Sequence, residues 1–119
     1  KTRAKAMLTL RFCCQGWSFA FIREGLQRYP IEHTRYSKAL PGDTWWNHPK
    51  APHVLEPGSA ADTHPYPVEL DLPQWTVARD VGLRNWLFGF GAGIRIESPA
   101  DLAIEHRTWL QRGLAVYGS

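Results

Sequence analysis

Three short stretches of this chain alternate apolar and polar residues at every second position, and this alternation constrains the fold more than any other feature. They are MLTLRF (7–12), YPVELDL (66–72) and AGIRIE (92–97). Successive side chains of a strand point to opposite faces, so these stretches predict half-buried β-strands. A weaker strand is expected within 33–40. The positions expected to face the core are Leu8, Leu10, Phe12, Val68, Leu70, Leu72, Ile94 and Ile96.

Helical spacing of apolar residues fills the segments between the strands. GWSFAFIREGLQRY (16–29) predicts a helix closed by Pro30, and TVARDVGLRNWLFGF (76–90) predicts a second helix. In the second helix we expect one apolar stripe, formed by Val77, Val81, Trp86, Leu87 and Phe90.

A third helix is predicted from 99 to 117. Ser98 has the residue type of an N-cap, Pro99 suits the first helical turn, and Asp101 complements the helix dipole. One side of this helix would carry Leu102, His106, Trp109, Leu110, Gly113 and Tyr117.

The order of elements is strand, helix, strand, long loop, strand, helix, strand, helix. It predicts an α+β fold, a ferredoxin-like split βαβ sandwich (βαββαβ) with an added C-terminal helix. Six of the nine prolines lie between 41 and 67, which we interpret as an irregular loop. We expect a single domain over 7–118, with 1–6 as a linker from an upstream domain, and helices on only one face of the sheet.

Three glycines, Gly89, Gly91 and Gly93, separate the second helix from the last strand. Glycine can end a helix in a left-handed cap and let the backbone turn sharply, so we interpret them as a structural turn. A phosphate cradle would need a glycine loop that leads from a strand into a helix, and this loop leads out of a helix.

The 119 residues suffice for one compact core, and no apolar run approaches the roughly 20 residues of a membrane span. No signal peptide is present, and the adjacent Cys13 and Cys14 cannot form an ordinary disulfide. We therefore expect a cytoplasmic protein without a membrane partner.

Residues 66–118 carry a combination of motifs known from one family. A helix ends in a WLFGFG run (86–91), Gly93 follows, IRIESP (94–99) forms a short strand, and the last helix closes in LAVY (114–117). This pattern resembles the C-terminal extension, called WCX, of WYL-domain transcriptional regulators. The resemblance is weaker over 7–40 and does not cover 41–65.

The resemblance implies a ferredoxin-like fold and a regulatory role without catalysis or a cofactor. Members of the family join a winged helix that reads DNA, a WYL effector-sensing domain and this extension. The extension helps to pair protomers and lies over the sensing domain of a neighbour. By this resemblance the partners would be a second copy, the WYL domain of the same or a neighbouring protomer, and DNA through a winged helix that this chain lacks.

The sheet face without helices carries the candidate binding residues Thr9, Arg11, Arg35 and Arg95. In a ferredoxin-like sheet the first strand lies between the third and the last, which would bring Arg11 close to Arg95. Paired arginines can bind phosphate or carboxylate with two hydrogen bonds each. Alternatively, they pair across the strands with Glu69, Asp71 and Glu97.

Further candidates lie outside this face. Trp45 and Trp46 are either interface anchors or pack over the sheet edge. We interpret His106 as a hydrogen-bonded histidine at the edge of the core or of an interface.

Sites for a metal or for catalysis find little support in the sequence. One candidate metal site lies in the proline-rich loop, where His48, His53 and His64 are joined by Asp43 and Asp62, but their spacing matches no zinc signature and we expect a solvated loop without metal. A cysteine with His33 is the one nucleophile–base pair that the chain offers, and nothing orients it.

The function that these observations favour is a non-catalytic C-terminal domain of a WYL-type regulator. It would support dimerisation and border an effector pocket formed with a partner WYL domain, the effector being an anionic ligand, a nucleotide or a single-stranded nucleic acid. The alternative is a basic module that itself binds single-stranded or duplex nucleic acid, because the net charge is +3 and ten of the 14 cationic residues are Arg.

Overall fold

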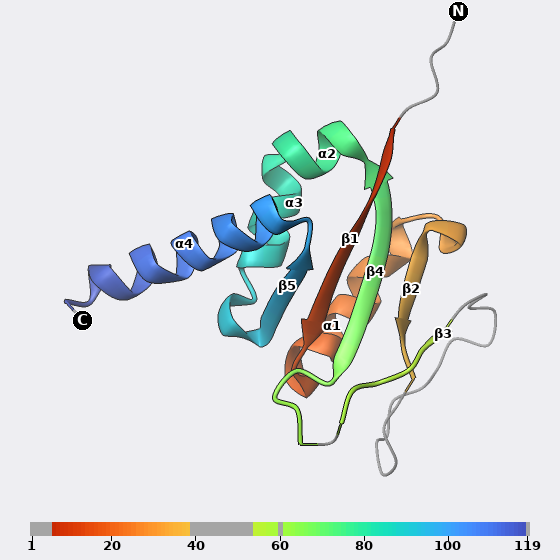
Figure 1. Cartoon of the computed structure of the whole chain (residues 1–119), viewed down its shortest axis with the longest axis horizontal. Helices are drawn as coiled ribbons and strands as arrows, with labels where there is room; N and C mark the ends of the chain where they lie inside the picture. Colours follow the sequence, from red (N-terminus) through yellow and green to blue (C-terminus); the bar gives the residue numbers. More distant parts are fainter. Residues whose placement is uncertain (1–5, 39–53, 60, 119) are drawn as a thin grey trace, which may run out of the picture.

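The computed structural model describes residues 6–38, 54–59 and 61–118, which form an α+β fold around one sheet (Figure 1). The strand order is β3-β2-β4-β1-β5. β1 is antiparallel to both β4 and β5, β2 is antiparallel to β4, and β3 is parallel to β2. The strands are β1 (Met7–Cys14), β2 (Thr34–Ser37), β3 (Val54–Leu55), β4 (Tyr66–Pro73) and β5 (Ile94–Ser98).

The three alternating stretches form β1, β4 and β5, as the sequence predicts, and the weaker candidate contains β2. β1 pairs with β4 along its whole length, so that Leu10 lies opposite Leu70 and Arg11 opposite Glu69. Because the register is fixed, the inner positions of both strands face the core together, and their polar positions share the other face.

The helices lie between and after the strands, in the segments whose apolar residues have helical spacing. The described helices are α1 (Gly16–Gly25), η1 (Leu26–Arg28), η2 (Ile31–His33), α2 (Gln74–Arg79), α3 (Val81–Phe88), η3 (Gly91–Gly93) and α4 (Ala100–Val116). None of them is long and apolar enough to cross a membrane.

The core lies between the sheet and the helices on its inner face. Leu10, Phe12, Val68 and Leu70 are fully buried there. They join one cluster with residues of α1, α3 and α4, which include Phe19, Ile22, Leu83, Leu87, Phe88 and Leu102. α1 runs behind the strands, while the opposite face of the sheet points toward the viewer (Figure 1).

The prediction of one continuous helix over 76–90 is wrong. Asp80 has an extended ψ of 110° and its side chain accepts a hydrogen bond from the backbone N–H of Leu83, so it ends α2 and caps α3. This break changes the phase of the stripe, because Leu83 is buried and Val81 is 67% exposed. An Asp inside a helical pattern can act as such a cap, which apolar spacing alone does not reveal.

Several boundaries also differ from the prediction. β5 begins at Ile94 and not at Ala92, because η3 occupies the residues before it, and α1 ends at Gly25, after which the short helix η1 follows. The N-cap of α4 is Pro99, with no side-chain capping bond, so Ser98 ends β5 and does not cap the helix. The 41–67 segment is not irregular throughout, because Val54 and Leu55 form β3 beside β2 and β4 begins at Tyr66. Residues 39–53 lie outside the described part of the chain.

Only one of the three glycines adopts the left-handed backbone expected of them. Gly91 has φ +55°, whereas Gly89 ends α3 with φ −61°. At Gly93 the reason for glycine is space, since a Cβ there would collide with the ring of Trp17. At Gly89 a Cβ would lie 2.9 Å from the carbonyl oxygen of Asn85, so two of the three glycines are required by space and Gly91 by its backbone conformation.

Candidate functional site

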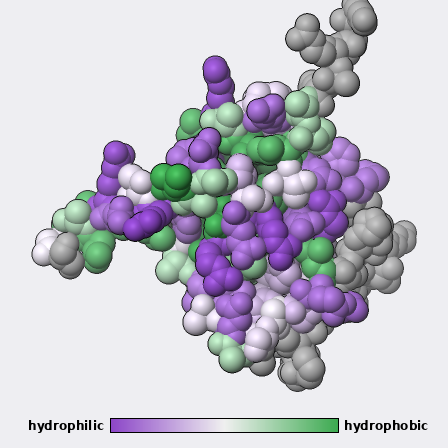
Figure 2. Space-filling model, viewed as in Figure 1, coloured by the Kyte–Doolittle hydropathy of each residue, from purple (hydrophilic) through white to green (hydrophobic). Residues whose placement is uncertain are grey.

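Seven side chains from four strands form a connected network on the sheet face that carries no core. We call this the polar sheet face, and Figure 2 shows hydrophilic residues gathered over the strands on this side. Its members are Thr9, Arg11, Arg35, Glu69, Asp71, Arg95 and Glu97. The network arises from the strand register, because polar residues at alternate positions of adjacent strands lie side by side.

Arg35 of β2 holds the two carboxylates of β4. Its Nη1 and Nη2 donate to the two oxygens of Asp71 at 2.9 and 2.7 Å, and its Nε donates to Glu69 at 2.8 Å. Thr9 Oγ1 adds a 2.8 Å bond to Asp71. This geometry is bidentate, the form in which arginine binds a carboxylate most strongly.

Arg11 of β1 connects the two strands that flank β1 in the sheet. Its Nη1 donates to Glu69 at 2.7 Å, and its Nε donates to Glu97 of β5 at 2.9 Å. Arg11 is therefore shared between β4 and β5, and its guanidinium already has carboxylates on both sides.

Arg95 of β5 is the least strongly paired arginine of the network. Its nitrogens lie 3.6 Å from Asp62 and 3.5 Å from Glu97, and 47% of its side chain is exposed. Exposed ion pairs at such distances contribute little to stability. Of the three arginines, Arg95 would lose least by exchanging its carboxylates for another anion.

The ion pairs set the pKa values of this face. Hydrogen bonds from Arg35 lower the pKa of Asp71 against the opposing effect of burial. Burial acts to raise the pKa of Glu69 and Glu97, but hydrogen bonds from the arginines outweigh it and lower both values. All three carboxylates are therefore ionised at neutral pH.

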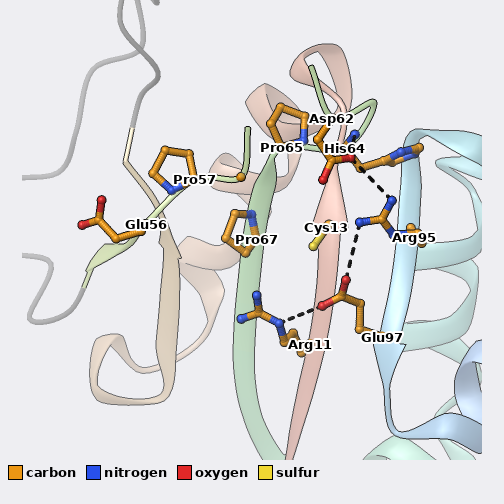
Figure 3. A pocket seen from close by; sticks show the side chains of 11 residues that line it. Arg11, Cys13, Glu56, Pro57, Asp62, His64, Pro65, Pro67, Arg95 and Glu97 are labelled. Carbon is orange, nitrogen blue, oxygen red and sulfur yellow. Dashed lines mark hydrogen bonds and ion pairs between the residues drawn. The ribbon is translucent and has the colours of Figure 1, made fainter. Parts of the chain in front are cut away.

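A shallow hollow of about 170 Å³ lies at one end of this face (Figure 3). Cys13 lies between Arg11 and Arg95 in it, and prolines of the 57–67 segment form one wall. Burial, followed by the charge of Glu97, raises the pKa of the Cys13 thiol to about 11. The thiol is protonated at neutral pH and gives no reactive thiolate.

Carboxylates outnumber arginines on this face. Arg11, Arg35 and Arg95 face four carboxylates, those of Asp62, Glu69, Asp71 and Glu97. Strong binding of a polyanion requires an excess of positive charge, which these residues do not provide. An anion could bind here by competing with Glu97 for Arg11 and Arg95.

The structure brings together the four sheet residues singled out in the sequence, Thr9, Arg11, Arg35 and Arg95. Of the two alternatives that the sequence offered, the structure shows the one in which these arginines pair with carboxylates of the strands. Sequence reasoning did not predict the pairing of Asp62 with Arg95, because Asp62 lies in a loop without periodicity. Trp45 and Trp46 lie outside the described residues.

His106 lies away from this face, at the docking site of α4. Its Nε2–H donates to the carbonyl of Gly91 at 3.0 Å, and its ring lies 5.3 Å from that of Phe88. Burial lowers the pKa of His106, partly offset by this bond. His106 thus ties α4 to the turn before β5, as expected of a histidine at the edge of the core.

Comparison with family models, curated proteins and solved structures found no match to this chain. Among the described residues no three His, Cys, Asp or Glu side chains gather closely enough to hold a metal ion.

Proposed function

We propose that this chain is a non-catalytic accessory domain of a WYL-type transcriptional regulator, placed after the sensing domain. It helps to pair protomers and covers part of an effector pocket with its polar sheet face. One observation carries the proposal: the sheet buries one face under helices and keeps on the other an ordered, solvent-accessible network of arginines and carboxylates.

We also infer that the sheet is a ferredoxin-like one with an added edge strand. The neighbours β2-β4-β1-β5 are all antiparallel, and two helical crossovers connect β1 to β2 and β4 to β5. β3 extends this sheet by two residues beside β2. This inference supports the resemblance on which the regulatory role depends.

In this role the arginines of the polar sheet face exchange one carboxylate partner for another anion. An anionic effector, or a carboxylate of the sensing domain, would compete with Glu97 for Arg95 and Arg11. If it binds one dimer geometry more tightly than another, it shifts the population toward that geometry and changes DNA affinity. Direct binding of nucleic acid is less well supported, because every arginine of this face is paired with carboxylates.

The test is operator release by the full-length regulator with Arg11→Ala and Arg95→Ala together. We expect the fold to persist and the effector response to fall at least tenfold. Arg79→Ala, which removes an exposed arginine of α2, is the matched control. An unchanged response, or a coding sequence upstream of residue 1 without a WYL domain and winged helix, would refute the proposal.

A second arm separates the nucleic-acid alternative. Oligonucleotides are titrated into the isolated chain at low and physiological salt, since phosphate contacts must weaken steeply as salt rises. We expect no binding that depends on Arg11 or Arg35. Salt-sensitive binding lost in those variants would favour the alternative instead.

A further inference from the structure

The two halves of α4 have different surroundings. In the first half Leu102 and His106 are 1% and 4% exposed against the globule. The second half extends away from the rest of the molecule (Figure 1). There Trp109, Leu114, Val116 and Tyr117 are 46%, 58%, 80% and 86% exposed.

Trp109, Val116 and Tyr117 continue the face that the first half buries, whereas Leu114 lies about 120° around the helix from Leu102. At 3.6 residues per turn, Trp109, Gly113 and Tyr117 lie on the same side of α4 as Leu102 and His106. Large apolar side chains that extend such a contact surface into solvent mark a place where another polypeptide packs.

Gly113, at the centre of the exposed half, has no explanation within residues 6–38, 54–59 and 61–118. A Cβ at this position would meet nothing within 4 Å, and the residue lacks a positive φ. Gly25 differs, because a Cβ there would press into the ring of Trp86. Glycine is the poorest helix former after proline, and it lets a second backbone approach closely.

We propose that the exposed half of α4 pairs antiparallel with the same segment of a second copy, centred on Gly113. The order of side chains is self-complementary, because Gly113 lies four residues after one aromatic residue, Trp109, and four residues before another, Tyr117. A two-fold axis at Gly113 places Trp109 opposite Tyr117 of the second copy and Gly113 opposite its equivalent, which is an isologous contact.

The charges permit this pairing. Arg107 and Arg112 are the only ionisable groups at 107–116, and both lie about 100–120° around the helix from Gly113. Neither guanidinium faces its equivalent across the apolar contact. The direction of the exposed half also places the two globules at opposite ends of the helix pair (Figure 1).

The area of the contact limits the affinity that it can support. On the side of α4 that carries Gly113, the exposed parts of Trp109, Val116 and Tyr117 offer about 400 Å² per copy, given that a whole aromatic side chain contributes about 150–250 Å². The total of about 800 Å² is below the roughly 1,200 Å² of a standard specific interface, so the contact belongs to the weak and transient class. The dimer of this chain alone should therefore have a Kd between about 10 μM and 1 mM.

The inference deepens the pairing of protomers in the proposed function and rests on it for its biological role. It is tested by sedimentation equilibrium of this chain from about 5 μM to 1 mM, a range that brackets the expected Kd. Gly113→Leu should weaken association at least tenfold, while Gln111→Leu, on the opposite side of α4, should not weaken it. Circular dichroism of both variants verifies that the helix is retained.

A cross-linking experiment tests the geometry. Gly113→Cys on the two-fold axis should form an intermolecular disulfide under mild oxidation, because the two Cα atoms come within disulfide reach, and Gln111→Cys should not. A wild-type chain that is monomeric throughout, undiminished association of Gly113→Leu, or equal cross-linking of both cysteine variants would overturn the pairing. None of these results would affect the role of the polar sheet face, which operator release measures separately.

Discussion

Gly91 shows how a single residue determines a turn in this protein. It has a left-handed φ of +55°, its carbonyl accepts the hydrogen bond of His106, and β5 begins three residues later. A residue with a Cβ is strained in this conformation, although nothing lies within 4 Å of that position. The demand for glycine here comes from the backbone alone.

We therefore expect Gly91→Ala to reduce the free energy of unfolding by about 1–2 kcal/mol, and Gly91→Asn to reduce it less, because Asn tolerates the left-handed region. Gly113→Ala is the matched control at low protein concentration: it relieves a helical glycine and should stabilise the chain by up to about 1 kcal/mol. Urea unfolding measures all three. An Ala at 91 that leaves stability unchanged would contradict the left-handed backbone.

Among the elements, the strands could be predicted well and the helices less well. Burial alternates with period two in the middle of β1 and over the second half of β4, so several residues independently indicate a strand, although both strands are buried on both faces at 12–14 and 66–68. The break between α2 and α3 depends on one side chain, Asp80. For the site, register predicts the cross-strand pairs of Arg11, whereas the pair of Arg95 with Asp62 depends on a loop whose path no periodicity encodes.

The docking of α4 should depend on pH through His106. Its pKa is lowered in the folded state, so the unfolded chain takes up the proton first as pH falls below about 6.5, and stability declines until the folded histidine is protonated too. The loss should begin as pH falls below about 6.5 and grow until the folded histidine is protonated.

His106→Gln keeps a donor for the Gly91 carbonyl but does not titrate. Its unfolding free energy should change less than that of the wild type over this interval, and amide exchange of α4 should show the same difference. Equal acid sensitivity of both proteins would show that other groups dominate this range.

At the scale of the whole molecule, the polar sheet face connects four strands through ion pairs whose partners are far apart in sequence. Because the pKa values of Asp71, Glu69 and Glu97 are lowered in the folded state, their contribution is present above about pH 4–5. It is lost as pH falls through the folded values.

Asp71→Asn should lower the unfolding free energy by about 1–2 kcal/mol at pH 7, because it weakens the bidentate bond to Arg35. The variant and the wild type should converge as pH falls through the lowered pKa of Asp71, since both then carry a neutral side chain at 71. Urea unfolding at pH 7, 4 and 2 checks this, with Glu24→Gln on the exposed side of α1 as control. A constant difference at all three pH values would mean that the ion pair contributes nothing.

The place of β1 between β4 and β5 affects how the chain can fold. β1 finds its neighbours only at 66–73 and 94–98, so more than 50 residues separate it from either one. During synthesis on the ribosome, β1 cannot pair with another strand until most of the chain has been made. Before that point only the helix that follows it in sequence can cover its apolar side chains. Such distant pairing makes folding slow for a chain of this length, and until β4 arrives both edges of β1 are open to other nascent chains.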